Sequence, residues 1–249
     1  MTGPALQAAA LAVPGRLEPV SLELGSGELV AMVGPNGAGK STLIQALAGL
    51  LPADGAIRWQ GQPLSRIPIA ERGRRLAWVG QEAHFEFAFL VREVVAQGRY
   101  AWGDDLAGVA EALAELDLTH LADRPATRLS GGERHRVGLA RALATQAPLQ
   151  LWDEPVAQLD VRHALEVLRL ARSLTAAGST VVVSLHDLRA AYRFDRVLVL
   201  DQGRLVGDGR PHDVLTAALI RQVFRVQATF VESLVPELPG EGPAPGLLP

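Results

Sequence analysis

The feature that most constrains the fold of this chain is the stretch GPNGAGKST at residues 34–42. An apolar segment with strand character, LVAMV, leads into it, and STLIQALAGL, with helical spacing, follows it. Glycines at positions 34, 37 and 39 allow the backbone to wrap around a polyphosphate with its N–H groups pointing inward. The following helix directs the positive end of its dipole at the same anion. A strand, a glycine-rich loop and a helix in this order predict a phosphate-binding loop.

The loop also contains Lys40, the only lysine among the 24 basic residues of the chain. A compact ammonium fits the crowded centre of a phosphate cradle, whereas a planar guanidinium is bulkier and prefers two partners at fixed angles. We therefore expect Lys40 to bind the β- and γ-phosphates of a nucleotide and the Ser41 hydroxyl to bind Mg²⁺. The predicted nucleotide-binding residues are Gly34, Pro35, Asn36, Gly37, Ala38, Gly39, Lys40, Ser41 and Thr42.

Short apolar runs separated by turn residues predict strands along much of the chain. They lie at residues 28–34, 56–61, 75–81, 149–152, 179–185 and 196–201. Helical spacing is found between them, at residues 41–50, 105–121, 131–146 and 161–178. This alternation predicts an α/β fold with a mostly parallel sheet covered on both faces. Residues 84–147 carry almost no strand signal and are expected to form a helical insertion.

Composition excludes several classes of protein. The chain has no cysteine, which rules out disulfides and thiolate chemistry, and its net charge of −3 argues against nucleic acid as a partner. No apolar run approaches the roughly 18 residues that span a bilayer. The apolar start of the chain lacks the basic region of a signal peptide, and Pro14 and Pro19 interrupt it. We therefore expect a cytoplasmic protein that does not cross a membrane by itself.

The segment LQLWDEP at residues 149–155 predicts a buried strand that ends in two carboxylates. Asp153 would hold Mg²⁺, and Glu154 would polarise an attacking water. An acidic pair at a strand end often only caps a loop, and it is the phosphate loop that favours a catalytic pair here. Gln150 is unusual inside such a strand and is expected to face a polar neighbour or to lie at a sheet edge.

LSGGERHRVGLARAL at residues 129–143 lies between the phosphate loop and the acidic pair. In this order the three motifs resemble those of the ATP-binding-cassette (ABC) ATPases. The resemblance implies a P-loop NTPase core with a mostly parallel sheet, an N-terminal antiparallel β-region and an inserted helical subdomain. It also implies ATP hydrolysis in a head-to-tail homodimer, in which the signature of one subunit contacts the nucleotide of the other. The implied trans-acting residues are Ser130, Gly131, Gly132 and Glu133. The Ser130 and Glu133 pair also fits an ordinary helix cap, which would not require the two glycines.

The same resemblance implies roles for three further residues. Gln81, after a predicted strand, matches the lid glutamine that senses the metal and the γ-phosphate, so it joins the predicted catalytic and Mg²⁺-binding residues. His186, also after a predicted strand, matches the switch histidine that contacts the γ-phosphate and positions water. Asp160 matches an aspartate that crosses the dimer interface.

The N-terminal region departs from the family pattern. Most relatives stack an aromatic residue from this region on adenine, whereas residues 11–24 contain none. An apolar contact through Val13 or Pro14 is the expectation instead. In domain terms, we expect residues 1–83 and 148–228 to form the nucleotide-binding core with the antiparallel β-region, residues 84–147 the helical signature subdomain, and residues 229–249 a disordered tail.

Residues that follow Gln81 indicate a membrane partner. Three phenylalanines lie within residues 85–89; at least one is expected in the core, and the others, if exposed, would form a groove for a short permease helix. The run VREVVAQGRYAW resembles the subgroup that serves importers of iron chelates, haem and vitamin B12, and the GQPL turn at residues 61–64 looks most like the vitamin B12 importers.

This resemblance implies a peripheral ATPase subunit on the cytoplasmic face of the inner membrane. Its partners would be integral permease subunits and a substrate-binding protein. Two alternatives remain, an importer of another substrate and a soluble ABC ATPase that acts on a macromolecule, although no coiled-coil insertion or basic arm is present. A nucleotide-binding regulator without turnover would be favoured if Glu154 or His186 were missing, and both are present.

Overall fold

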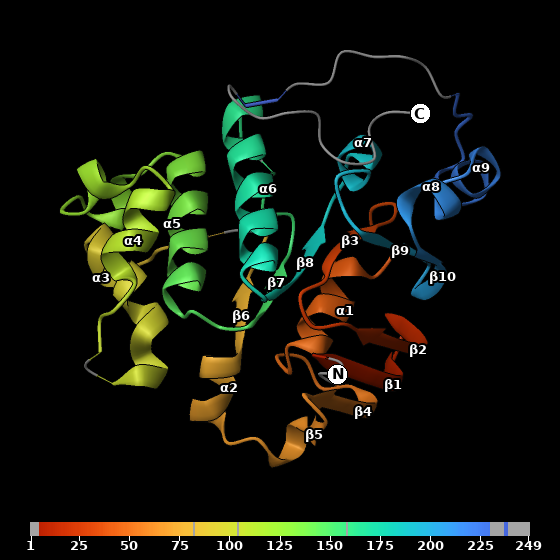
Figure 1. Ribbon diagram of the computed structural model, residues 1–249, viewed down its shortest axis with the longest axis horizontal. Coiled ribbons are helices and arrows are strands. Elements are labelled where there is room, and N and C mark those ends of the chain that lie inside the picture. The colour runs from red at the N-terminus through yellow and green to blue at the C-terminus, as the bar shows by residue number, and fades with distance from the viewer. Residues whose placement is uncertain (1–4, 82, 104, 158, 230–236, 239–249) are drawn as a thin grey trace.

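The structure is a computed structural model that describes residues 5–81, 83–103, 105–157, 159–229 and 237–238 (Figure 1). Its centre is a six-stranded sheet in the order β10-β9-β3-β8-β7-β6. The strands of this sheet are β3 (Leu29–Val33), β6 (Leu76–Val79), β7 (Leu149–Trp152), β8 (Thr180–Ser184), β9 (Arg196–Asp201) and β10 (Arg204–Gly209). Neighbouring strands are parallel except for β9 and β10, which are antiparallel.

A smaller antiparallel sheet in the order β2-β1-β4-β5 lies next to helix α1 (Lys40–Leu47) and strand β10 (Figure 1). Its strands are β1 (Leu6–Val13), β2 (Leu17–Leu24), β4 (Asp54–Trp59) and β5 (Gln62–Pro63). Because β2 is an edge strand, it tolerates Pro19, which has no N–H to donate to a neighbour.

Helices cover both faces of the larger sheet (Figure 1). The α-helices are α1 (Lys40–Leu47), α2 (Ile69–Arg75), α3 (Val91–Ala96), α4 (Val109–Glu115), α5 (Gly131–Ala144), α6 (Val161–Ala176), α7 (Leu188–Ala191), α8 (Pro211–Val214) and α9 (Ala217–Phe224). Short 3₁₀ helices are η1 (Leu64–Arg66), η2 (Gln97–Trp102), η3 (Thr119–Leu121) and η4 (Ala126–Arg128). Within the described part of the chain, no helix has both the length and the hydropathy to span a bilayer.

The two faces of the large sheet belong to two hydrophobic cores, as alternation along β3 shows. Leu29, Ala31 and Val33 belong to the core beneath α6 and the helical insertion. Val30 and Met32 belong to the core that contains α1 and the antiparallel sheet. Because successive side chains of a strand point to opposite faces, a strand buried on both faces is a continuous apolar run.

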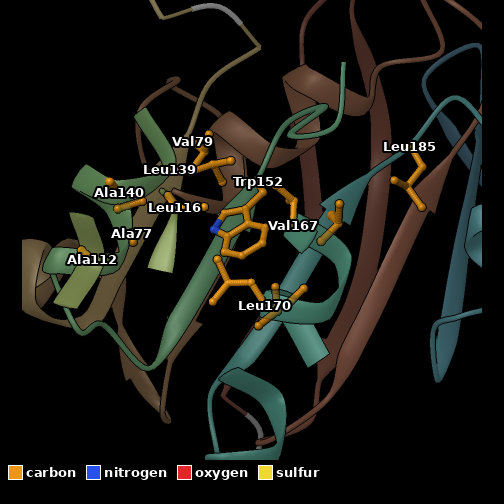
Figure 2. Close-up of a cluster of buried hydrophobic side chains, with 14 of the residues drawn as sticks. Ala77, Val79, Ala112, Leu116, Leu139, Ala140, Trp152, Val167, Leu170 and Leu185 are labelled. Carbon is orange, nitrogen blue, oxygen red and sulfur yellow. The ribbon is translucent and has the colours of Figure 1, made fainter. Parts of the chain in front are cut away.

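Helices α3, α4 and α5 form the insertion between β6 and β7, and they lie together on the left of Figure 1. The chain leaves the sheet after β6 and returns in the adjacent parallel strand β7. Trp152 at the end of β7 is fully buried, and Figure 2 shows its ring among side chains from α5 and α6. One core therefore joins the insertion to the sheet.

The predicted fold class is confirmed, and all six predicted strands are present. The helix predicted over residues 105–121 is wrong in extent, since α4 covers Val109–Glu115 alone. Asp117 adopts the left-handed φ of 51°, and the Leu118 N–H donates to the Leu113 carbonyl at 2.8 Å. This Schellman-type ending stops the helix without the glycine that would have marked it in the sequence.

Other expectations have mixed outcomes. Gln150 lies in a strand with neighbours on both sides, where its side chain donates to the Ala147 carbonyl and accepts from the Trp152 indole. Of its two predicted settings, the polar neighbour is confirmed. Most of the tail predicted for residues 229–249 lies outside the described residues.

Candidate functional site

A cavity of about 730 Å³ opens at the carboxyl ends of the parallel strands. Residues 36–42 of the phosphate loop line it, and so do Gln81, Glu154 and His186. These three side chains follow β6, β7 and β8, so three parallel strands deliver them to one edge of the sheet. Ligands of open α/β sheets bind at this edge, beyond the carboxyl ends of the strands.

The phosphate loop ends at Gly39, whose φ of 101° lies in the left-handed region, and α1 begins at Lys40 without a side-chain cap. The first N–H groups of this helix are therefore available to an anion. Lys40 is only 5% exposed, and its Nζ donates to the carbonyls of Gly34 at 2.8 Å and Pro35 at 3.3 Å. Burial lowers the pKa of Lys40, and the nearby carboxylates of Glu154 and Asp153 oppose this shift.

The side chain of Glu154 is 8% exposed, and both of its carboxylate oxygens have a partner. Its Oε1 lies 2.7 Å from His186 Nε2, and its Oε2 accepts a hydrogen bond of 2.8 Å from Gln81 Nε2. The structure thus brings together the three side chains that the sequence predicted as catalytic. Their shared contact fixes the direction of the Glu154 carboxylate, the group expected to polarise water.

Sequence reasoning missed Ser184, which links the two predicted acidic residues. Its fully buried hydroxyl donates to Asp153 Oδ1 at 2.7 Å and accepts from the Glu154 backbone N–H at 2.8 Å. Glu154 has a φ of 53°, a left-handed conformation that is strained for a side chain of this size. The only signal in the sequence is a polar residue that follows three valines at the end of the strand TVVVS.

The signature residues do not line this cavity. Ser130 caps α5, with the Glu133 N–H donating to its hydroxyl at 3.3 Å and the Ser130 N–H donating to Glu133 Oε2 at 2.7 Å. These hydrogen bonds with Ser130 lower the pKa of Glu133, with Arg124 and Arg136 adding to the effect. Gly131 and Gly132 form the first turn of the same helix.

Asp160 also lies outside the cavity and caps α6 by accepting from the His163 backbone N–H at 2.9 Å. Hydrogen bonds from the backbone and ring of His163 lower the pKa of Asp160. The predicted trans-acting residues and the predicted interface aspartate are thus separate from the cavity that holds the phosphate loop.

The expected contact to adenine through Val13 or Pro14 stays a prediction. Neither Val13 nor Pro14 lines the cavity; residues 15–18 of the β1–β2 turn line it instead, together with Gln202 and Gly203 of the β9–β10 turn.

A phosphate loop at the end of a parallel strand, with a buried carboxylate beside it, defines a P-loop nucleoside triphosphatase. More specifically, the chain belongs to the ABC transporter family and is an ABC-type ATPase. The family model described as ABC transporter matches residues 17–157.

Similar proteins include two import ATP-binding proteins. The chain is 47% identical over 216 residues to the hemin import ATP-binding protein HmuV of Streptomyces coelicolor, which covers 84% of this chain and 77% of the relative. It is 42% identical over 217 residues to the cobalamin import ATP-binding protein BtuD of Halobacterium salinarum, covering 84% of this chain and 54% of that protein. A solved ATP-binding subunit of an ABC transporter matches with a TM-score of 0.77 at 27% identity, over 90% of this chain and 95% of that one.

Proposed function

We propose that this chain is the ATP-hydrolysing subunit that powers import of a metal chelate through a separate membrane permease. The observation that carries the hydrolytic part is the engaged Glu154 carboxylate in the same cavity as the phosphate loop. Haem is the favoured cargo, because the chain is 47% identical to a hemin import protein over 77% of that protein, against 42% identity over 54% of a cobalamin import protein. The similarity to a cobalamin import protein keeps vitamin B12, the cargo that the sequence favoured, as the second candidate. A ferric siderophore belongs to the same class.

In this proposal each residue of the cavity has a distinct task. Lys40 and the first turn of α1 bind the phosphates, and burial of the ammonium strengthens its attraction to them. Glu154 accepts a proton from the attacking water, while His186 and Gln81 hold its carboxylate in place through the contacts described above. Nucleotide binding would break the hydrogen bond from Gln81 to Glu154. The conformation of the segment that begins at Gln81 would then depend on whether nucleotide is bound.

The oxygen atoms around the phosphate loop suit Mg²⁺, which prefers hard oxygen ligands. Ser184 occupies only Oδ1 of Asp153, and no described residue donates to the other carboxylate oxygen. The Gln81 amide oxygen and the Ser41 hydroxyl likewise have no hydrogen-bond partner among the described residues. These three residues would hold Mg²⁺, which when bound neutralises charge on the β- and γ-phosphates.

The position of the signature supports a homodimer. Gly131, Gly132 and Glu133 begin a 14-residue helix that Ser130 caps, and none of the four lines the cavity of its own subunit. A helix N-terminus with two glycines is suited to bind an anion, and the terminal phosphate bound by a second subunit would supply it. Asp160 would lie at the same contact.

The phenylalanines after Gln81 support a permease contact. Phe85 packs against the core, as predicted, whereas Phe87 and Phe89 are 68% and 47% exposed and pack edge to face at 6.0 Å. An exposed aromatic pair of this kind suits an apolar helix of a membrane partner. The chain would then act at the cytoplasmic face of the inner membrane, with a substrate-binding protein delivering cargo from the other side.

The test of hydrolysis is Glu154→Gln, which keeps the shape of the side chain and removes the base. We expect ATP turnover to be lost while ADP binding is retained. Glu111→Gln on the exposed surface of α4 is the matched control and should turn over ATP at the wild-type rate. Unchanged turnover in Glu154→Gln would contradict the mechanism.

The cargo is tested separately, by uptake in cells that lack the gene for this chain. The wild-type chain, but not Glu154→Gln, should restore uptake of haem. Restored uptake of cobalamin alone would reassign the cargo while leaving the ATPase mechanism intact.

A further inference from the structure

The N-terminus of α6 carries a carboxylate with more hydrogen bonds than a helix cap requires. The backbone N–H of His163 donates to Asp160 Oδ1 at 2.9 Å, which is the ordinary bond between a cap and the third residue of a helix. The ring of His163 adds a second contact, with Nδ1 at 2.9 Å from Oδ1 and 2.8 Å from Oδ2 of the same carboxylate. The main-chain bond alone would complete the cap, so the contact of the imidazole needs another explanation.

The ring contact fixes the orientation of both side chains. An ionised carboxylate only accepts hydrogen bonds, so Nδ1 of His163 carries a proton and donates. Hydrogen bonds from the backbone and then the ring of His163 lower the pKa of Asp160, which keeps the carboxylate ionised. The side chain of His163 is 29% exposed, whereas that of Asp160 is 65% exposed. A largely packed ring therefore holds an exposed carboxylate in one orientation.

The segment that leads from Glu154 to Asp160 is short and anchored. The Ala157 N–H donates to the Glu154 carbonyl at 3.0 Å, and Leu159 packs against the core beneath α6. Neither Asp160 nor His163 lines the nucleotide cavity, so their contact lies outside the site that binds nucleotide in the same subunit. The segment thus joins the expected catalytic base to a carboxylate that is held in place and open to a second molecule.

We propose that His163 is a positioning residue of the homodimer, which holds the Asp160 carboxylate in the orientation that meets the second subunit. This inference deepens the proposed function and rests on the homodimer proposed there. A charged group that enters an interface loses water, and it stabilises the complex only if its hydrogen bonds are kept. The imidazole keeps such a bond in place before association, so less side-chain freedom is lost when the subunits meet.

The test is dimerisation driven by Mg-ATP, measured by analytical ultracentrifugation. Glu154→Gln is the parent, because it should bind ATP without turnover and let the dimer accumulate. His163→Phe keeps a ring and removes the donor, and in this parent it should raise the Kd of the dimer about tenfold. The Kd for ADP should stay within about twofold of the parent value, because His163 does not line the cavity.

Two further variants separate positioning from packing. His163→Asn supplies an amide N–H near the position of Nδ1, and should keep the Kd of the dimer within about threefold of the parent value. In a parent that also carries Asp160→Ala, His163→Phe should change the Kd of the dimer by less than about twofold, because the ring acts through the carboxylate.

The matched control is His120→Phe in η3 of the insertion. Nδ1 of His120 lies 3.8 Å from Asp117 Oδ1, so this pair has the same three-residue spacing and is likewise exposed. The substitution should leave the Kd of the dimer unchanged. Thermal unfolding of each variant without nucleotide would establish that the fold and the cap of α6 are intact.

Three outcomes would overturn the proposal. They are a His163→Phe variant that dimerises as the parent does, a His163→Asn variant as weak as His163→Phe, and a tenfold effect of His163→Phe that persists without the Asp160 carboxylate. The proposed function fails in a different way, if the Glu154→Gln parent itself stays monomeric with Mg-ATP, and the role of His163 would then fall with the homodimer.

Discussion

Replacing Ser184 with alanine tests how the catalytic loop is held. The substitution removes one buried hydroxyl and with it two hydrogen bonds, one to Asp153 Oδ1 and one from the Glu154 N–H. Leaving the buried N–H without a partner costs about 1–3 kcal/mol, and a hydrogen bond to a charged carboxylate contributes about 1.5–3 kcal/mol. Because a single hydroxyl serves both contacts, their effects overlap, and we expect the free energy of unfolding to fall by about 3 kcal/mol.

Ser184→Ala should lower kcat by more than the loss of folding stability explains. Glu154 has a φ of 53°, and a strained residue of this kind persists only while its surroundings hold it at a cost of about 1–3 kcal/mol. Without the Ser184 hydroxyl the loop would relax, and the Glu154 carboxylate would move away from His186 and Gln81. A displacement of about 1 Å at a reacting group lowers kcat about 100-fold. Ser184→Thr retains the hydroxyl and should restore most of the rate.

The measurement is kcat for ATP together with the Kd for ADP and the midpoint of urea unfolding. Thr180→Val is the matched control, because the Thr180 hydroxyl at the other end of β8 donates to the Gly25 carbonyl at 2.8 Å and accepts from the Gly27 N–H at 3.1 Å. It removes the same kind of buried hydroxyl far from the carboxylates, so it should destabilise the fold without lowering kcat. Equal loss of kcat in both variants, or a wild-type kcat in Ser184→Ala, would refute a positioning role for Ser184.

Three further substitutions have outcomes fixed by the structure. Lys40→Arg should abolish ATP-driven dimer closure and hydrolysis, because the buried ammonium between the Gly34 and Pro35 carbonyls leaves no room for a guanidinium; wild-type hydrolysis would contradict this. Burial lowers the pKa of His135 from 6.5, so its contribution to stability is complete above pH 6.5 and is lost as the pH falls below it. Thermal unfolding measured above and below that pH should show a smaller acid-induced loss in His135→Gln than in the wild type. Trp152→Ala should lower the free energy of unfolding by about 3–5 kcal/mol in urea titrations, because the fully buried ring joins the insertion to the sheet.

Strands β3, β6, β7, β8 and β9 of the large sheet could be predicted because each is a short apolar run. The edge strand β10 was not predicted, and its residues alternate between exposed and half-buried. The antiparallel sheet gave a weaker signal. β1 is rich in alanine, which has low strand propensity, and β2 contains Pro19, which is compatible only with the edge position that it takes. For these two strands the resemblance to the ABC ATPases, rather than local propensity, indicated their existence.

The candidate site likewise contains residues that could be predicted from the sequence and residues that could not. Gln81, Glu154 and His186 each follow a strand. The roles of Gln81 and His186 came from the resemblance to the ABC ATPases, and the shared edge of parallel strands explains why the three side chains meet. The contact of the Ser184 hydroxyl with the acidic pair could not be predicted, since nothing in the sequence states which strands are neighbours.

Ser184 contacts the acidic pair only because β8 lies between β3 and β7 in the sheet. In the sequence, β8 comes after both of these strands. Val183 of β8 is paired with Trp152 of β7, and this register places Ser184 one residue further on, beside Asp153. A slip of one residue would turn the hydroxyl to the opposite face of the sheet and put an apolar side chain against the carboxylate. The valines of β8 fill both cores and so fix the register, which means that packing far from the nucleotide sets the orientation of Asp153 and Glu154.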